Sequence, residues 1–171
     1  MQSTDIQSTD TTPIPLFEER QRITQWWVYA LVILPMLPIL VILILAGEID
    51  TPEQVGLFFI IFLGTAGLIP LIRMDTKIDQ QAIRVRLFPF HLKYRIYPWN
   101  EIESAEVRKY SPLGEYGGWG IRYGGKAKGW AYNVKGDRGL QIVLNDGKRV
   151  LIGTSSPNSM ERAIAARVRA S

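Results

Sequence analysis

The sequence predicts a membrane α-helical hairpin followed by a mainly-β domain that is closed by one C-terminal α-helix. Three patterns support this prediction. Two long apolar runs without charge lie in the first 72 residues. Alternation of apolar and polar residues with a period of two follows, and the last segment changes to a period close to four. These periods are typical of membrane spans, half-buried strands and an amphipathic helix, respectively.

The two apolar runs are long enough to cross a bilayer. Residues 26–46 and 55–72 contain 21 and 18 residues without a charged side chain, and a hydrocarbon core needs about 20 helical residues. The first run has no polar face, which argues against a buried helix of a soluble fold. The polar stretch before it and the second run after it argue against a cleaved signal peptide. Residues 25–72 are therefore expected to form a two-helix transmembrane hairpin, kinked near Pro35 and Pro38.

Charge predicts the orientation of this hairpin. Residues 47–54 between the runs carry three acidic residues and no Lys or Arg, whereas Arg20 and Arg22 precede the first run and Arg73 and Lys77 follow the second. The positive-inside rule then places both termini in the cytoplasm, in a multi-pass protein of the inner or plasma membrane. The absence of Cys agrees with a reducing compartment. Residues 1–24 are predicted to be a polar, disordered tail.

Residues 73–171 are enough for one small domain. The segments AIRVRLF and LKYRIY alternate and predict half-buried strands joined by a turn at FPF. The residues expected to point inward are Ile83, Val85 and Leu87 in the first segment and Leu92, Tyr94 and Ile96 in the second. EIESAEVRKY predicts a strand with a bulge, and GLQIVL and KRVLIG flank Asp146-Gly147, a strong hairpin signal.

The end of the sequence predicts a helix over about 157–170. Met160, Ile164 and Val168 recur every four residues, with Ala163 beside them. Ser156 is the expected N-cap, with Pro157 at the first helical position. We therefore expect about seven short antiparallel strands closed by this helix.

Two short sequence motifs in this arrangement indicate a resemblance to a known family. YPWNEIESAEV at residues 97–107, and LIGTSSP leading into the terminal helix, follow two adjacent spans. The chain in this respect resembles the bacterial pleckstrin-homology-like (PH-like) membrane proteins, with Trp99, Glu101, Ile102 and residues 150–157 in the recurring places. The resemblance implies a partly open β-barrel or sandwich plugged by the C-terminal helix, and implies little about activity. The Gly-rich residues 114–129 depart from the general pattern, as in a separate subfamily.

Within that Gly-rich stretch, GIRYGGKA comes close to a phosphate-binding loop. Gly120, Gly125 and Lys126 have the required spacing, but Ala127 replaces the Ser or Thr that would hold magnesium. The residues after Lys126 have the pattern of a turn and a strand, whereas a phosphate loop needs a helix there. The sequence instead predicts a strand at GIRYG, a hairpin connection over 124–129 and a returning strand at WAYNV. The glycine spacing also misses the dinucleotide-binding fingerprint.

Basic residues concentrate in the second part of the chain. Residues 73–171 hold 18 of the 20 basic and 9 of the 16 acidic residues, a net charge of +9, whereas residues 1–72 have a net charge of −5. A basic, aromatic surface near a membrane suits anionic lipid headgroups or a protein partner. Ordinary solvated strand faces are the alternative explanation. The candidate lipid or partner contacts are Arg108, Lys109, Trp119, Arg122, Lys126, Lys128 and Trp130.

The sequence offers little for catalysis. His91 is the single His, there is no Cys, and Glu101 and Glu103 lie on one strand face. We expect no catalytic residue, metal or cofactor. The expected function is a non-enzymatic, membrane-anchored module that binds a protein partner, anionic inner-leaflet lipid or both, with homo-oligomers possible and no nucleic acid. The alternatives are an assembly subunit of a larger membrane complex and, less favoured, a lipid- or nucleotide-acting enzyme.

Overall fold

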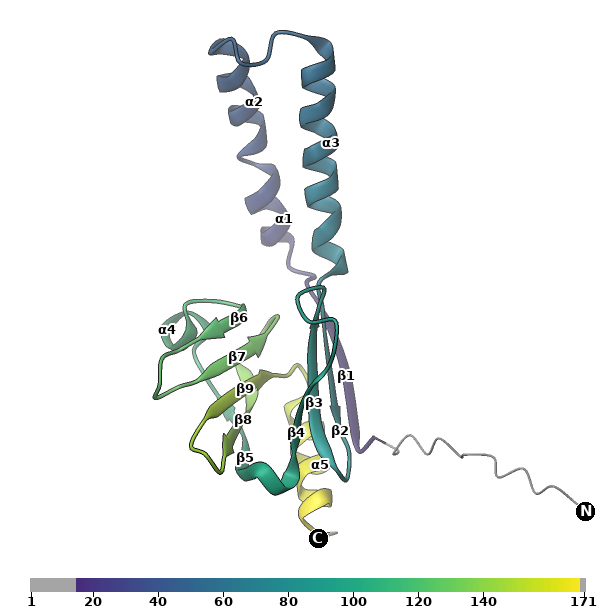
Figure 1. Cartoon of the computed structure of the whole chain (residues 1–171), viewed down its shortest axis with the longest axis vertical. Coiled ribbons are helices and arrows are strands. Elements are labelled where there is room, and N and C mark those ends of the chain that lie inside the picture. The colour runs from purple at the N-terminus through teal and green to yellow at the C-terminus, as the bar shows by residue number, and fades with distance from the viewer. Residues whose placement is uncertain (1–14, 170–171) are drawn as a thin grey trace, which may run out of the picture.

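A helical hairpin stands on a two-sheet β domain in the computed structural model, which describes residues 15–169 (Figure 1). This confirms the predicted combination of two apolar helical arms, a mainly-β domain and a C-terminal helix. Residues 1–14 of the predicted tail and residues 170–171 lie outside the described part of the chain.

The first arm of the hairpin consists of α1 (Trp26–Ile33) and α2 (Met36–Leu45), and the second of α3 (Pro52–Leu68) with the 3-10 turn η1 (Ile69–Leu71). By length and composition, Trp26–Leu45 and Pro52–Leu71 are each able to cross a membrane. The break between α1 and α2 includes Pro35, as predicted, because proline has no N–H to donate, whereas Pro38 lies within α2. Thr51 begins α3 with a reciprocal capping box to Gln54.

The chain enters the β domain before the hairpin. Strand β1 (Phe17–Arg22) pairs antiparallel with β2 (Arg73–Ile78), and Phe17 lies in the core. The prediction of a tail over residues 1–24 is therefore wrong over β1, and the domain does not begin at residue 73. Because the hairpin is inserted between two hydrogen-bonded neighbours, both of its ends must emerge on the same side of any bilayer that it crosses.

The β domain has two sheets. The first has the order β1-β2-β3-β4 and the second β5-β8-β9-β7-β6. The remaining strands are β3 (Ala82–Phe88), β4 (Arg95–Pro98), β5 (Ile102–Lys109), β6 (Gly120–Tyr123), β7 (Trp130–Asn133), β8 (Arg138–Leu144) and β9 (Arg149–Gly153). Neighbouring strands are antiparallel except β7 and β9, which are parallel. The described residues thus form nine strands, and the two that the sequence analysis missed are β1 and β2.

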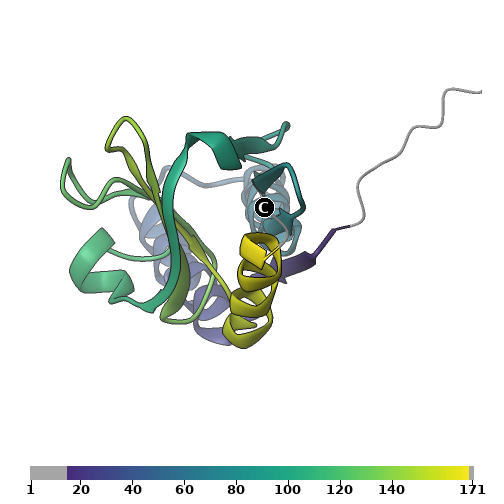
Figure 2. The ribbon, with the colours of Figure 1, turned by 90° about the horizontal axis from the view of Figure 1, so that it is seen from below.

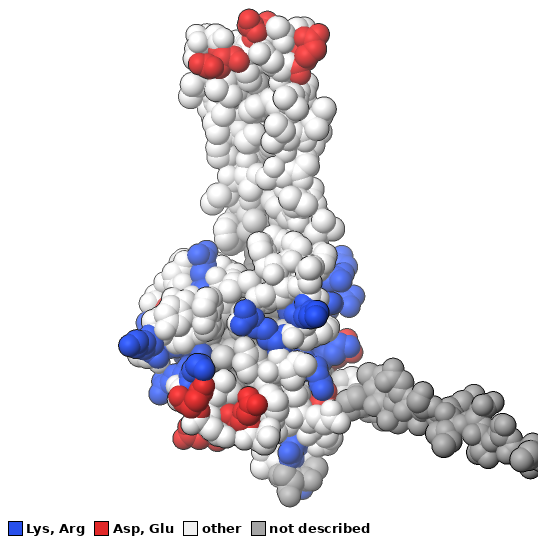
Figure 3. Space-filling model, in the orientation of Figure 1, with Lys and Arg blue, Asp and Glu red and all other residues white. Residues whose placement is uncertain are grey.

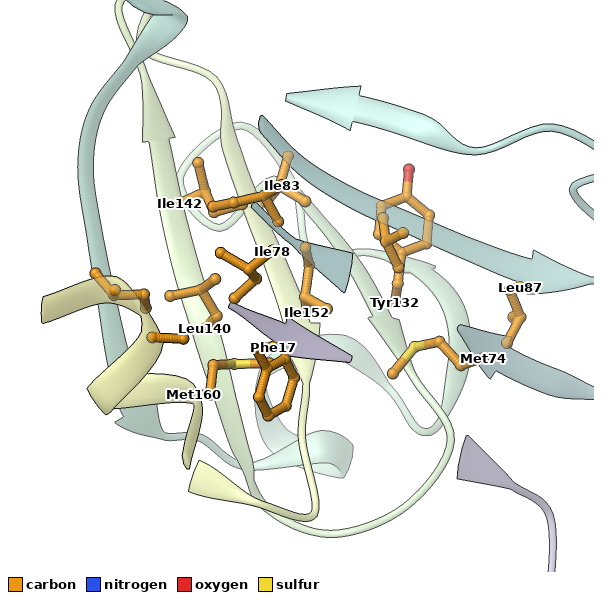
Figure 4. Close-up of a cluster of buried hydrophobic side chains, with 14 of the residues drawn as sticks. Phe17, Met74, Ile78, Ile83, Leu87, Tyr132, Leu140, Ile142, Ile152 and Met160 are labelled. Carbon is orange, nitrogen blue, oxygen red and sulfur yellow. The ribbon is translucent and has the colours of Figure 1, made fainter. Parts of the chain in front are cut away.

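The core lies between the sheets and is closed on one side by α5 (Pro157–Arg169). Apolar side chains from both sheets meet there, including Ile83, Ile142 and Ile152 (Figure 4). Seen from below, α5 lies beside both sheets (Figure 2), and it buries Met160, Ala163 and Ile164. Val168, predicted to face inward, is 65% exposed.

The prediction for β4 is wrong in its inward face. Leu92 precedes the strand, and Leu92 and Ile96 are exposed, whereas Tyr97 lies opposite the buried Ile83 and shares its face. A shift of one residue exchanges the two faces of a strand, which turns Ile96 outward, whereas Tyr94 also precedes β4 and is half-buried. The predicted bulge in β5, between Ile102 and Ser104, and the hairpin between β8 and β9 are confirmed.

Two short helices were not predicted. The 3-10 turn η2 (Trp99–Glu101) connects the sheets, and the Trp99 indole N–H donates to the Asp79 carbonyl at 2.8 Å. Helix α4 (Pro112–Tyr116) begins after Ser111, whose hydroxyl accepts the Gly114 N–H at 3.0 Å. It packs Tyr116 against the outer face of the second sheet.

Candidate functional site at the base of the hairpin

The seven predicted contact residues do not form one surface. Arg108 is half-buried and engaged within the domain, because its guanidinium donates to both carboxylate oxygens of Glu115, at 3.2 and 2.7 Å, and to the Gln141 side chain. The hydrogen bond from Arg108 holds the pKa of Glu115 below its usual range. Lys109 lies 3.4 Å from Asp137 in an exposed ion pair. Lys128 donates to the Glu115 carbonyl at 3.4 Å.

The Gly-rich stretch forms a β-hairpin, made of β6 and β7, that packs closely against β9. GIRY forms β6, residues 124–129 connect it to β7, and the strand predictions on both sides are confirmed. A strand, and not a helix, follows Lys126, so the backbone lacks the helix N-terminus that a phosphate loop requires. Gly129 has a φ of +72°, and a Cβ there would lie 1.9 Å from the Arg149 carbonyl oxygen. The glycine is needed for close backbone approach.

Lys126 and Trp130 lie toward the tip of this hairpin, at the end of β6 and β7 remote from α1. Trp130 is 46% exposed and packs against Tyr123, with ring centroids 5.2 Å apart. Together with Arg95, Tyr97 and Lys148 they line an open cleft of about 430 Å³. Burial raises the pKa of Tyr97 far above its usual value, so its phenol stays protonated.

Trp119 and Arg122 lie at a different and larger cavity, of about 780 Å³, at the base of the helical hairpin formed by α1, α2 and α3. We call this the hairpin-base cavity. Its walls come from the start of α1, from the connections that join the hairpin to β1 and β2, and from the adjacent ends of both sheets. Its apolar lining includes Ile23, Val28, Ile72, Leu87, Ile121 and Val134.

The aromatic wall of the cavity joins the helical hairpin to the β domain. Trp27 of α1 and Trp119 lie with ring centroids 5.8 Å apart. The Trp119 indole N–H donates to the Gly136 carbonyl at 3.2 Å, and the Trp119 carbonyl accepts the Arg122 Nε–H at 2.9 Å. Trp119 is therefore held by a ring contact to the helical hairpin and by a hydrogen bond to the β domain.

The other polar residues in the cavity are occupied by internal hydrogen bonds. The buried Asn133 side chain accepts the Gly120 N–H at 2.8 Å and donates to the Tyr110 hydroxyl at 3.0 Å. Gln25 donates to the Val134 carbonyl at 3.1 Å. Within the described residues, the terminal guanidinium nitrogens of Arg122 have no hydrogen-bond acceptor. Arg122 is thus the polar group that the cavity leaves available.

Apolar side chains surround this region in positions that the sequence analysis missed. Phe90, which lines the cavity, and Leu92 in the β3–β4 loop are 63% and 75% exposed, and Leu113 of α4 is 68% exposed. FPF was interpreted as a turn and Leu92 as a core residue. The sequence signal for an exposed apolar loop was a Phe on each side of Pro89, in a turn that follows the second predicted span.

Two further cations, which are not among the seven predicted contacts, lie on segments that contribute to the cavity lining or adjoin it. Arg22 ends β1, four residues before Trp26, and Lys93 belongs to the loop that reaches the base of α3 (Figure 1). Both are exposed and form no ion pair within residues 15–169. By contrast, Arg20 and Arg86 are bound to the buried Asp75 at 2.8 and 2.6 Å.

Residues 15–169 contain no group of three or more His, Asp and Glu side chains arranged to hold a metal ion. His91 packs against Tyr132, with ring centroids 5.5 Å apart, and burial together with the nearby Arg95 lowers its pKa. Burial raises the pKa of Asp75, but hydrogen bonds from Arg86 and Arg20 outweigh that effect and lower it. Asp79 caps the β2–β3 turn by accepting the Gln81 and Ala82 N–H groups.

The hairpin-base cavity therefore combines an apolar interior, an aromatic wall and one available cation, which is chemistry suited to binding an amphipathic molecule. Comparison of the chain with protein-family profiles, with curated proteins and with solved structures finds no match.

Proposed function

We propose that this chain is a membrane-anchored, non-catalytic interaction module. In this proposal the helical hairpin crosses the inner or plasma membrane twice, and a PH-like β domain is held against the cytoplasmic leaflet, where it contacts anionic lipid. The two sheets and the closing helix α5 support the PH-like assignment. The strands β6 and β7, with α4, would be an insertion between β5 and β8.

The distribution of charge carries the proposal. Acidic side chains lie at the far tip of the hairpin, its sides show no charge, and most Lys and Arg side chains in view lie on the part of the β domain nearest to it (Figure 3). No residue of α1, α2 or α3 is buried. An apolar column between an acidic and a basic region has the charge distribution that the positive-inside rule gives a spanning hairpin.

The lipid contact is assigned to cations beside the hairpin. Arg22, Lys93 and Arg122 lie on segments next to α1 and the cavity, and each cation near an anionic surface contributes about 1 kcal/mol. Lys126 and Lys128, predicted as lipid contacts, lie beyond the remote end of β6, and Arg108 is bound to Glu115. Lys126, Lys128 and Arg108 are therefore not assigned to the lipid contact.

Bilayer nanodiscs test this assignment with the full-length chain. We expect anionic lipid, compared with zwitterionic lipid, to slow hydrogen exchange in residues 89–94, and high salt to remove the difference because it screens surface charge. Replacing both Arg22 and Lys93 by Gln should remove most of this protection. The matched control replaces Lys126 and Lys148 by Gln and should leave it intact. Equal exchange rates in the two lipids would reject the lipid contact.

A second candidate function is an assembly subunit of a larger membrane complex. Gly56, Gly64 and Gly67 of α3 lie within about 80° of one another around the helix axis, and a Cβ added at any of them would meet no atom within 4 Å. Small residues at such positions let membrane helices approach closely. This observation favours packing against a helix of another chain.

A further inference from the structure

The hairpin-base cavity is open to its surroundings and lies against the first turn of α1. Its lining contains residues of α1 and of the two connections into the sheet, Ile23 and Ile72. Exposed Phe90 and Leu113 line it as well, and Trp26 beside it is 76% exposed. If the hairpin spans a bilayer, this side of the cavity lies at the boundary between headgroups and acyl chains, where aromatic residues concentrate.

We infer that the cavity binds one acyl chain of an anionic phospholipid from the adjoining leaflet, with the Arg122 guanidinium on its phosphate. This inference rests on the proposed function, because it requires the hairpin to be in the membrane. It adds a defined site for a single lipid to the diffuse surface attraction described above.

The interior of the cavity selects an apolar occupant. Asn133 and Gln25 are engaged by internal hydrogen bonds, so a polar solute would find few partners and would leave its own groups unpaired. A volume of about 780 Å³ lies within the range of small-molecule sites. At the base of a spanning hairpin, the acyl chains of the bilayer are the most abundant apolar groups available to fill it.

The charge at the cavity favours an anionic headgroup, because the choline cation of a zwitterionic lipid offsets the attraction of Arg122 to the phosphate. The Arg122 Nε–H is used by the Trp119 carbonyl at 2.9 Å, which orients the guanidinium. Its terminal nitrogens have no acceptor in the described residues, and a guanidinium binds phosphate oxygens in a bidentate manner. Trp119 is itself fixed by Trp27 and Gly136, so the cation is presented by a rigid wall.

The test is lipid retention by the full-length chain. The protein is purified in detergent, stripped of lipid and titrated with phosphatidylglycerol or phosphatidylcholine, with native mass spectrometry and the unfolding temperature as readouts. We expect one phosphatidylglycerol to bind saturably and to raise the unfolding temperature, because a ligand that binds the folded state stabilises it. Absence of a saturable single-lipid complex would overturn the inference.

Matched substitutions on α1 locate the site. Val28→Trp adds bulk from the helix side of the cavity, outside the β core, and should weaken binding at least about tenfold, roughly 1.4 kcal/mol. Leu31→Trp, on an exposed position one turn further along α1, should bind as the parent chain does. Arg122→Gln should remove the preference for phosphatidylglycerol while phosphatidylcholine still binds. Unchanged binding by Val28→Trp would place the lipid elsewhere and contradict the inference.

Two outcomes separate this inference from its alternatives. If the chain is an oligomer that Val28→Trp dissociates, the occupant is a helix of a second copy and the lipid site is wrong. If no single lipid binds but residues 89–94 are still protected by anionic nanodiscs, the proposed function stands and only the cavity site fails.

Discussion

At the scale of single residues, the glycines of the β6–β7 hairpin show how position decides what a residue does. Gly125 and Gly129 both have positive φ, at +83° and +72°. A Cβ on Gly125 would meet nothing within 4 Å, whereas one on Gly129 would overlap the Arg149 backbone. GIRYGGKA, which comes close to a nucleotide loop, thus holds an open turn position at Gly125, whereas Gly129, two residues beyond it, allows the close approach of β7 to β9.

This difference predicts the effect of two matched substitutions. Gly125→Ala should cost about 1–2 kcal/mol, the usual penalty of a left-handed conformation. Gly129→Ala should cost at least about 3 kcal/mol, because the backbone must also move away from Arg149. Chemical unfolding of the detergent-solubilised chain measures both free energies. Equal costs at the two positions would show that Gly129 does not approach β9 closely.

Residue patterns were informative where one face is fully buried. Ile83, Val85 and Leu87 were predicted inward and are buried, because they pack against the opposite sheet. Leu92 and Ile96 carry the same alternation and were predicted wrongly. Exposed apolar residues follow the same hydropathy as core residues, so periodicity alone does not separate the two.

At the scale of elements, β1 explains most of the error in the predicted domain boundaries. Its sequence, FEERQR, has one apolar residue and therefore has no strand pattern. Its stability comes from distant partners: Arg20 binds Asp75, and Gln21 donates to the Gly153 carbonyl at 2.9 Å. The two residues of the first contact are 55 positions apart in the sequence and those of the second are 132 apart, so neither contact can be predicted from the local sequence.

The role of β1 predicts which soluble fragments fold. Residues 73–169 alone should fail to form a cooperatively unfolding domain, because the buried Asp75 loses Arg20 and the edge of β2 is uncovered. Replacing residues 23–72 by Asn-Gly joins Arg22 to Arg73, which lie opposite each other, through a two-residue hairpin turn. This second chain should unfold in one cooperative transition by circular dichroism. Cooperative folding of residues 73–169 alone would contradict the structural role of β1.

At the scale of the whole molecule, hydropathy and charge predicted the hairpin, and the fold adds a constraint that they lack. Two spans were predicted from length, and two helical arms of sufficient length are present. The pairing of β1 with β2 requires the segments before and after the hairpin to share one side of any membrane that the hairpin crosses. The hairpin-base cavity was not predictable, because its walls come from both sheets, from α4 and from α1.

The absence of cysteine from the chain allows the topology to be measured directly. Single cysteines are introduced at Asp50 in the hairpin loop, at Glu18 in β1 and at Glu103 in β5, all exposed positions. A membrane-impermeant maleimide is applied to intact cells and then to permeabilised cells. The account predicts labelling of Asp50→Cys in intact cells, and of Glu18→Cys and Glu103→Cys only after permeabilisation. Labelling of Glu18→Cys or Glu103→Cys in intact cells would contradict a β domain held at the cytoplasmic leaflet.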